Sequence, residues 1–256
     1  MPHGGLVSIT FRQLTPEQVV ELMGRTELTR IEWGGDVHAP HGDADAADRV
    51  AELTRNAGLT PCTYGSYYRC GVSEDKGLCF LDVLDSARRL GAPDIRVWAG
   101  DLGTQNADDA HWERVVHDAR RVADHAARDG IGLVFEYHAG TLTDTHEAAV
   151  KLLHLIDRPN VRLGWQPVPV RTHEQNQRDL GDLLDRGGLA TVHAFQWTAS
   201  DRGVVRHPLA DGESEWRDYL RQLNDADVPV LIEFVKGNAP EQFLADAAAL
   251  SRWLSR

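Results

Sequence analysis

The 256-residue chain lacks any apolar run long enough to cross a membrane. A spanning helix needs about 20 predominantly apolar residues, and every apolar run in this sequence falls well short of that length. The N-terminus also lacks a basic region followed by an apolar one, the pattern of a secretory signal. We therefore expect a cytoplasmic protein that has no membrane partner.

Cysteine and basic charge are also scarce. Cys62, Cys70 and Cys79 are odd in number and form no C-x-x-C pair, so we expect neither a disulfide framework nor a cysteine zinc site. The net charge of -12 would repel nucleic acid, so we expect no nucleic-acid partner. Because no glycine-rich phosphate-binding motif follows any expected strand, dinucleotide and P-loop sites are not supported. These absences favour small-molecule chemistry.

The sequence does contain a regular alternation of short apolar runs with helical segments. This pattern predicts an α/β fold, a (β/α)8 TIM barrel, formed as a single domain by residues 1–256. Residues 198–213 are predicted to form a long polar loop, and Asn238-Ala239-Pro240-Glu241 predicts a capping box for the last helix. The expected strands lie at residues 6–11, 30–33, 59–64, 95–98, 132–138, 161–165, 190–192 and 228–232.

Four successive expected strands run into a residue that can bind a metal ion or move a proton. These residues are Glu136, Gln166, His193 and Glu233. The C-terminal ends of barrel strands converge on one face, so the four side chains are predicted to meet there. Three oxygen ligands and one imidazole suit Mn, Mg, Co or Zn without choosing among them. Since two glutamates would neutralise a divalent cation, we expect one such ion at the strand ends.

With these residues the whole chain resembles the xylose isomerase-like (sugar phosphate isomerase/epimerase) barrel superfamily. Members bind one divalent metal ion through a Glu, an Asp, a His and a Glu on strands five to eight. Glu136, His193 and Glu233 match three of those positions, whereas Gln166 stands in place of the usual Asp and Pro169 in place of a frequent His. The resemblance implies an isomerase or epimerase of carbohydrate metabolism. In it, Glu136 and Glu233 would exchange protons with a sugar through a metal-stabilised enediolate.

Several other functions remain open at this stage. The same enediolate can expel a leaving group, which would make the protein a lyase or dehydratase. A barrel whose metal site has decayed, with Gln166 as the sign of it, would instead bind a ligand or a partner subunit. The related AP endonucleases use more metal ligands and a basic track for DNA, which this acidic chain does not offer. Members of the superfamily are often dimers or tetramers, so a homo-oligomer is possible.

Further polar and aromatic residues near the strand ends are candidates for binding a sugar or polyol. Tryptophans are more often core residues than sugar platforms, and His138 is open to either a substrate contact or a supporting role beside Glu136. The candidate substrate-binding residues are Arg12, Glu32, Trp33, His38, His41, Arg96, Trp98, His138, Trp165, Arg202, Arg206 and Lys236.

Overall fold

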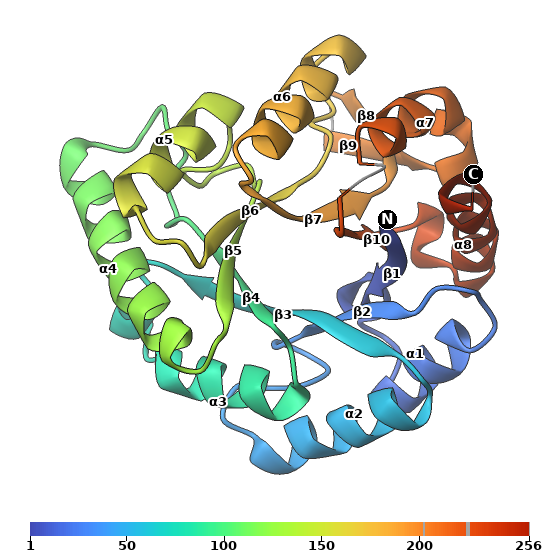
Figure 1. Cartoon of the computed structure of the whole chain (residues 1–256), viewed down its shortest axis with the longest axis horizontal. Helices are drawn as coiled ribbons and strands as arrows, with labels where there is room; N and C mark the ends of the chain where they lie inside the picture. The colour runs from blue at the N-terminus through green and yellow to red at the C-terminus, as the bar shows by residue number, and fades with distance from the viewer. Residues whose placement is uncertain (202, 224–225, 256) are drawn as a thin grey trace. The chain divides into compact units, whose positions relative to one another are not determined.

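The computed structural model describes residues 1–201, 203–223 and 226–255 (Figure 1). Its strands are β1 (His3–Val7), β2 (Arg30–Gly34), β3 (Thr60–Arg69), β4 (Asp94–Trp98), β5 (Gly132–Glu136), β6 (Val161–Trp165), β7 (Leu189–Ala194), β8 (Gln196–Ser200), β9 (Gly203–His207) and β10 (Pro229–Ile232). The α-helices are α1 (Pro16–Met23), α2 (Ala44–Asn56), α3 (Phe80–Leu90), α4 (Asp109–Arg128), α5 (His146–Ile156), α6 (His173–Asp185), α7 (Glu213–Gln222) and α8 (Pro240–Leu254). Short 3-10 helices are η1 (Ser8–Phe11), η2 (Glu74–Lys76), η3 (Leu209–Gly212) and η4 (Lys236–Asn238).

The strand connections confirm the predicted fold class. Eight strands close into a barrel in the order β1-β10-β7-β6-β5-β4-β3-β2. The remaining two strands, β8 and β9, form a separate antiparallel hairpin. Within the described residues, no helix combines the length and the apolar character needed to span a bilayer.

By their internal contacts, the residues group into two compact units. The first unit comprises residues 1–33, 52–60 and 165–256, and in it β10 pairs in parallel with both β1 and β7. The second unit comprises residues 34–51 and 61–164, and in it β4 pairs in parallel with both β3 and β5. In Figure 1, α7 and α8 lie outside β7 and β10, and α3 to α5 lie outside β4 and β5.

Strands β7 and β10 of the first unit are buried on both faces, as parallel strands covered by helices should be. All six residues of β7 are buried, and so are Val230, Leu231 and Ile232 of β10. On the helix side, Phe243 of α8 meets Phe11 edge to face, with ring centroids 5.7 Å apart. The ends of β7 and β10 therefore rest on a buried, apolar base.

The cap predicted for the last helix is wrong, whereas α1 begins with a complete capping box. At α1, the Thr15 side chain accepts from the Gln18 amide and Gln18 bonds back to the Thr15 amide, a complete capping box. At α8, the N-cap is Ala239 and no side chain caps the helix. The oxygen of Asn238 that was expected to cap it instead accepts a hydrogen bond from Arg206 Nη1 at 2.6 Å.

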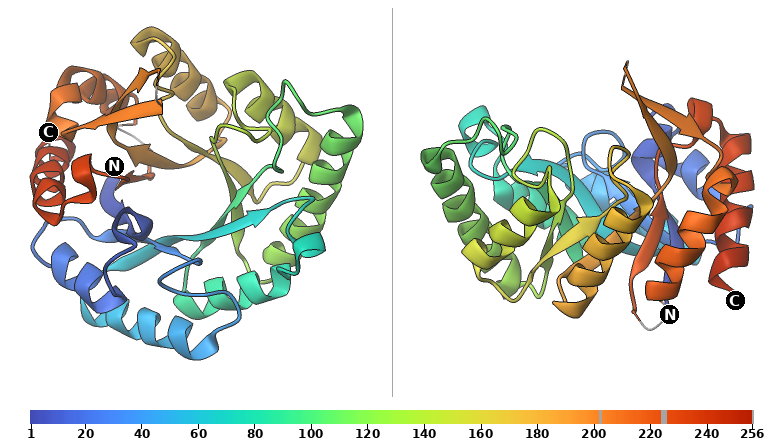
Figure 2. Two further views of the ribbon diagram at one scale, coloured as in Figure 1. Left: turned by 180° about the vertical axis from the view of Figure 1, so that it is seen from behind. Right: turned by 90° about the horizontal axis from the view of Figure 1, so that it is seen from above.

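The predicted polar loop at residues 198–213 is wrong in its first part, because β8 and β9 extend into it over residues 198–200 and 203–207. Trp197 pairs with Arg206 and Gln196 with His207 across the hairpin. Figure 2 shows the hairpin projecting beyond the C-terminal end of β7. Its signal in the sequence is weak, because short hairpin strands that are largely exposed carry no continuous apolar run.

Candidate active site

In the first unit, three buried titratable side chains lie at the strand ends and form what we call the His193 cluster: Glu32, His193 and Glu233. His193 Nδ1 lies 3.2 Å from Glu233 Oε2, and His193 Nε2 lies 4.0 Å from Glu32 Oε2. The side chains are at most 4% exposed. The imidazole therefore lies between two carboxylates, in a setting where charge is costly unless it is compensated.

The strand register explains how His193 and Glu233 meet. Leu231 of β10 pairs with His193 of β7, and the amide of Glu233 donates to the carbonyl of Ala194 at 3.1 Å. The next residue, Phe234, adopts a left-handed conformation with φ 51°, which is uncommon outside glycine. Such strain persists only where the surroundings enforce it, and it is often found beside functional residues.

In the second unit, Glu136 ends β5 and is held by two donors from β4. Arg96 Nη1 and Trp98 Nε1 both donate to Glu136 Oε2, the latter at 2.5 Å. Arg96 and Trp98 are two residues apart on β4 and so share one face. Arg96 pairs in register with Val134, two residues before Glu136. The two donors hold the carboxylate of Glu136 in place through Oε2.

The indole of Trp98 is itself held on both sides. The guanidinium of Arg69 lies 4.0 Å from the ring centroid, and the imidazole of His138 stacks on the indole at 4.2 Å between centroids. Tyr67 meets the same indole edge to face at 5.4 Å. His138 is thus placed beside Trp98, and both of its predicted roles stay open.

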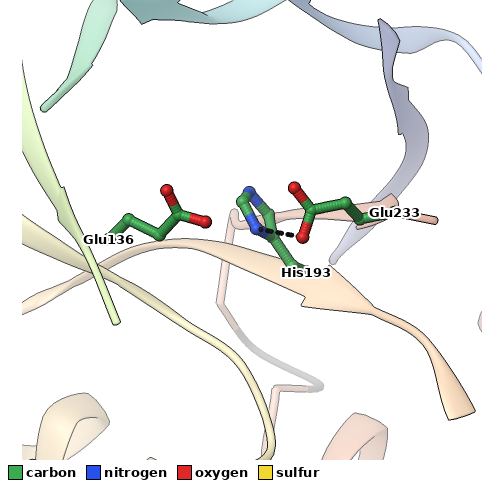
Figure 3. Close-up of side chains that lie close together, drawn as sticks. All are labelled: Glu136, His193 and Glu233. Carbon is green, nitrogen blue, oxygen red and sulfur yellow. Dashed lines mark ion pairs between the residues drawn. The ribbon is translucent and has the colours of Figure 1, made fainter. Parts of the chain in front are cut away.

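Glu136, His193 and Glu233 each offer a ligand atom, and these atoms all lie within 4.8 Å of one another (Figure 3). Two carboxylates and one imidazole suit a divalent ion, whose charge would offset the two negative charges. The donor set therefore fits the metal ion that the sequence predicted. Gln166 directly follows β6 and is half-buried, and its part as a fourth ligand stays a prediction.

Several predicted substrate contacts lie in other environments. Trp33 is fully buried and donates to Thr54 of α2 at 3.0 Å, and Trp165 packs edge to face on Tyr219 of α7 at 5.1 Å. Both indoles therefore pack between a strand and a helix. Successive side chains of a strand point to opposite faces, so these two indoles lie on the face away from a substrate bound inside the barrel.

The predicted residues on loops have mixed surroundings. His38 is buried, and His41 donates from Nε2 to the Ser66 carbonyl at 2.5 Å, while burial lowers the His41 pKa. Arg12 and Lys236 are exposed. Arg202 lies outside the described residues.

The sequence reasoning missed Arg69 and Tyr67, which contact Trp98. It ended the third strand at Tyr64, whereas β3 continues to Arg69. The missed signal is the alternation of half-buried Tyr67 and Arg69 with buried Tyr68 along the strand. Tyr67 lies within β3 and has φ 56°, which is also uncommon outside glycine.

Comparison with known proteins identifies the relatives of this chain. The profile of the family described as xylose isomerase-like TIM barrel matches residues 20–254. The 3-dehydroshikimate dehydratase of Bacillus anthracis is 22% identical over 171 residues, which span 61% of this chain and 61% of that relative, less than two thirds of its length.

Two solved structures extend the comparison over the whole chain. The probable 3-DHS dehydratase AsbF from Bacillus anthracis has a TM-score of 0.81 at 18% identity, covering 98% of this chain and 99% of that one. D-allulose 3-epimerase from Methylomonas sp., in complex with D-allulose, has a TM-score of 0.74 at 15% identity, covering 100% and 97%. At such identities the likeness shows the shared fold, and the relatives include a dehydratase as well as an epimerase.

Proposed function

The chain belongs to the xylose isomerase-like TIM barrel family, and from that premise we propose a metal-dependent enzyme acting on a small polyhydroxylated carbonyl compound. Its first step removes a proton next to the carbonyl group. The observation that carries this proposal is the buried set of Glu136, His193 and Glu233, whose ligand atoms lie within 4.8 Å of one another. We favour the loss of water as the second step, with epimerisation as the second candidate.

Glu136, His193 and Glu233 would hold the ion, with the amide oxygen of Gln166 as a fourth donor. When bound, a divalent ion supplies Lewis acidity, which acidifies the C–H bond next to a carbonyl and stabilises the developing oxyanion. The set does not choose among Mn, Mg, Co and Zn. Without a third carboxylate, we expect the affinity for the metal to be modest.

Glu136 and Glu233 are the proposed acid–base pair. Glu136 is held by Arg96 and Trp98, which both donate to Oε2 and so would position the carboxylate toward a substrate carbon. Glu233 is positioned by His193, which contacts its Oε2 at 3.2 Å. One carboxylate would take the proton, and the other would protonate either the departing hydroxyl or the opposite face of the carbon.

The comparisons support dehydration over epimerisation. The curated relative is a dehydratase, and the dehydratase structure has the higher TM-score of the two described above. Both reactions share the first proton transfer, so the residues that perform it are the same in either case. The epimerase structure, with D-allulose bound, supports epimerisation as the second candidate.

The test begins with metal content, measured by elemental mass spectrometry on protein purified without chelator. We expect close to one divalent ion per chain in the wild type and a marked loss in Glu233→Gln. Protein from the same preparations is then incubated in D2O with Mn²⁺ and either 3-dehydroshikimate or D-allulose, and followed by NMR. Deuterium exchange with loss of water supports the dehydratase, and exchange with formation of the epimer supports the second candidate.

The matched control is Glu241→Gln, which removes a carboxylate from the exposed first turn of α8. It should keep both metal and exchange activity. Absence of bound metal in the wild type, even after Mn, Mg, Co or Zn is added, would refute the proposal. That result would favour the decayed barrel.

A further inference from the structure

The β8–β9 hairpin carries an arginine in an unusual setting. Arg206 is half-buried, and its guanidinium carbon lies 4.7 Å from the ring centroid of Phe234 and 5.6 Å from that of Trp197. Its Nη1 donates to Asn238 Oδ1 at 2.6 Å. The side chain is therefore held in place by two aromatic rings and an amide oxygen, contacts that orient a guanidinium without neutralising it.

Two other arginines of the same unit show the usual arrangement, an ion pair with a carboxylate. Arg171 pairs with Asp179 at 2.9 Å, and Arg217 pairs with Glu213 at 2.5 Å. Across the residues that the structure describes, Arg206 has no carboxylate within ion-pair distance. A partly desolvated cation without a counter-ion is costly, so its retention points to a ligand that supplies the negative charge.

The hairpin pairing adds a second donor beside this cation. Trp197 lies directly across from Arg206 in the antiparallel register, so the two side chains share one face of the hairpin. The indole Nε1 of Trp197 is buried and has no hydrogen-bond partner in the described part of the chain. A bound oxygen ligand would satisfy it.

This pair lies next to the proposed catalytic residues of the first unit. Phe234, on which the guanidinium rests, directly follows Glu233 and has the left-handed backbone described above. Burial lowers the Arg206 pKa, while the negative charge of Glu233 raises it, so the two groups interact electrostatically. An anion bound by Arg206 would therefore lie close to a substrate carbon that Glu233 reaches.

We infer that the substrate carries a carboxylate, and that Arg206, seated on Phe234 and paired with Trp197, binds it. The inference rests on the proposed function and narrows its substrate class from polyols in general to hydroxylated carbonyl acids. One guanidinium matches the single charge and the two oxygens of a carboxylate. A phosphate, with a charge of about -1.5 to -2 at pH 7, would call for further cations or a cradle of backbone amides.

The experiment compares an acid with its neutral ester on the intact, Mn²⁺-loaded protein. The probes are shikimate and methyl shikimate, which lack the reactive carbonyl, and binding is measured by calorimetry. We expect the acid to bind the wild type about 10- to 100-fold more tightly than the ester, as a charge-assisted hydrogen bond would give.

Substitutions at Arg206 test whether this residue causes the tighter binding of the acid. In Arg206→Gln, the affinity for the acid should fall to that for the ester, and the affinity for the ester should not change. Arg206→Lys should keep part of the preference for the acid over the ester. The control Arg178→Gln removes the same charge from an exposed position of α6 and should keep the full preference. This set of results would support the inference.

An acid that binds the wild type no more tightly than its ester, or not at all, would overturn the inference. So would an equal weakening of acid and ester in Arg206→Gln, because that would indicate a structural role for Arg206. Such outcomes leave the proposed function standing if the same preparations hold metal and exchange deuterium into D-allulose. Loss of metal binding and of exchange with every substrate would instead refute the proposed function.

Discussion

Replacing Arg96 by methionine should destabilise the metal-free protein strongly. The side chains of Arg96 and Glu136 are 2% and 5% exposed, so the substitution leaves a buried carboxylate without its nearest cation. Removing one partner of a buried ion pair costs about 3–5 kcal/mol. For a chain of this size, 1 kcal/mol corresponds to roughly 2–4 °C in Tm, so the expected decrease is about 6–20 °C.

A bound divalent ion should offset part of this loss. Arg96→Met removes a positive charge beside a proposed metal ligand, so the variant should bind Mn²⁺ more tightly than the wild type does. Ligand at 100 times its Kd stabilises the folded state by about 2.7 kcal/mol. The difference in Tm between the variant and the wild type should therefore narrow as Mn²⁺ is added.

Thermal unfolding with and without Mn²⁺ measures both effects. The control makes the same Arg96→Met substitution in a Glu136→Gln background, where no buried carboxylate is left unpaired. In that background the loss of Arg96 should lower the free energy of unfolding by less than it does when Glu136 is present. A cost below about 1 kcal/mol for Arg96→Met would contradict the stability argument, judged against the buried-pair range. A difference in Tm that stays constant as Mn²⁺ is added would contradict the link between Arg96 and the metal site.

Two further predictions concern stability away from the proposed site. Burial raises the pKa of Asp246 to about 6, so stability should fall as pH rises from about 4 toward 6, where the unfolded chain releases this proton first. The side chain in Asp246→Asn can still accept the hydrogen bond from the Leu209 amide. In urea unfolding, this variant should have a larger free energy of unfolding than the wild type at pH 7.5 but not at pH 4. Gly100→Ala would place Cβ 2.5 Å from His111 Nε2 at φ 78°, whereas Gly130→Ala has open space at φ 70°. Backbone strain should lower the free energy of unfolding of both variants by about 1 kcal/mol. The contact with His111 should destabilise Gly100→Ala further, so equal losses for the two variants in urea unfolding would refute the steric argument.

The order of strands and the residues at their ends could be predicted from the sequence because both are local signals. A buried parallel strand is a short apolar run, and the residue that ends it lies on the face where barrel sites form. Glu136, His193 and Glu233 were identified in this way, and their ligand atoms do lie close together. Gln166 was identified by the same signal, but the sequence does not show whether its amide binds a metal.

Partners of these residues depended on strand register, which the sequence does not encode locally. Arg96 and Trp98 stay predicted substrate contacts, and only the structure shows that both also donate to Glu136, across the pairing of β4 with β5. The β8–β9 hairpin was missed because its strands are short and half exposed. Its cross-strand pairing joins Arg206 to Trp197, and the backbone at Phe234 brings a second ring under the same guanidinium.

The sequence by itself therefore determined the barrel and the chemical nature of the groups at its strand ends. Apolar periodicity and the identity of the residue that ends each strand are properties of short segments, so both can be read without a structure. Only the tertiary structure decided which carboxylate is held by an arginine, which indoles are packed against helices, and which arginine lies against two aromatic rings. Those properties arise from contacts between residues far apart in the chain, such as Asn238 with Arg206, and no local pattern specifies them.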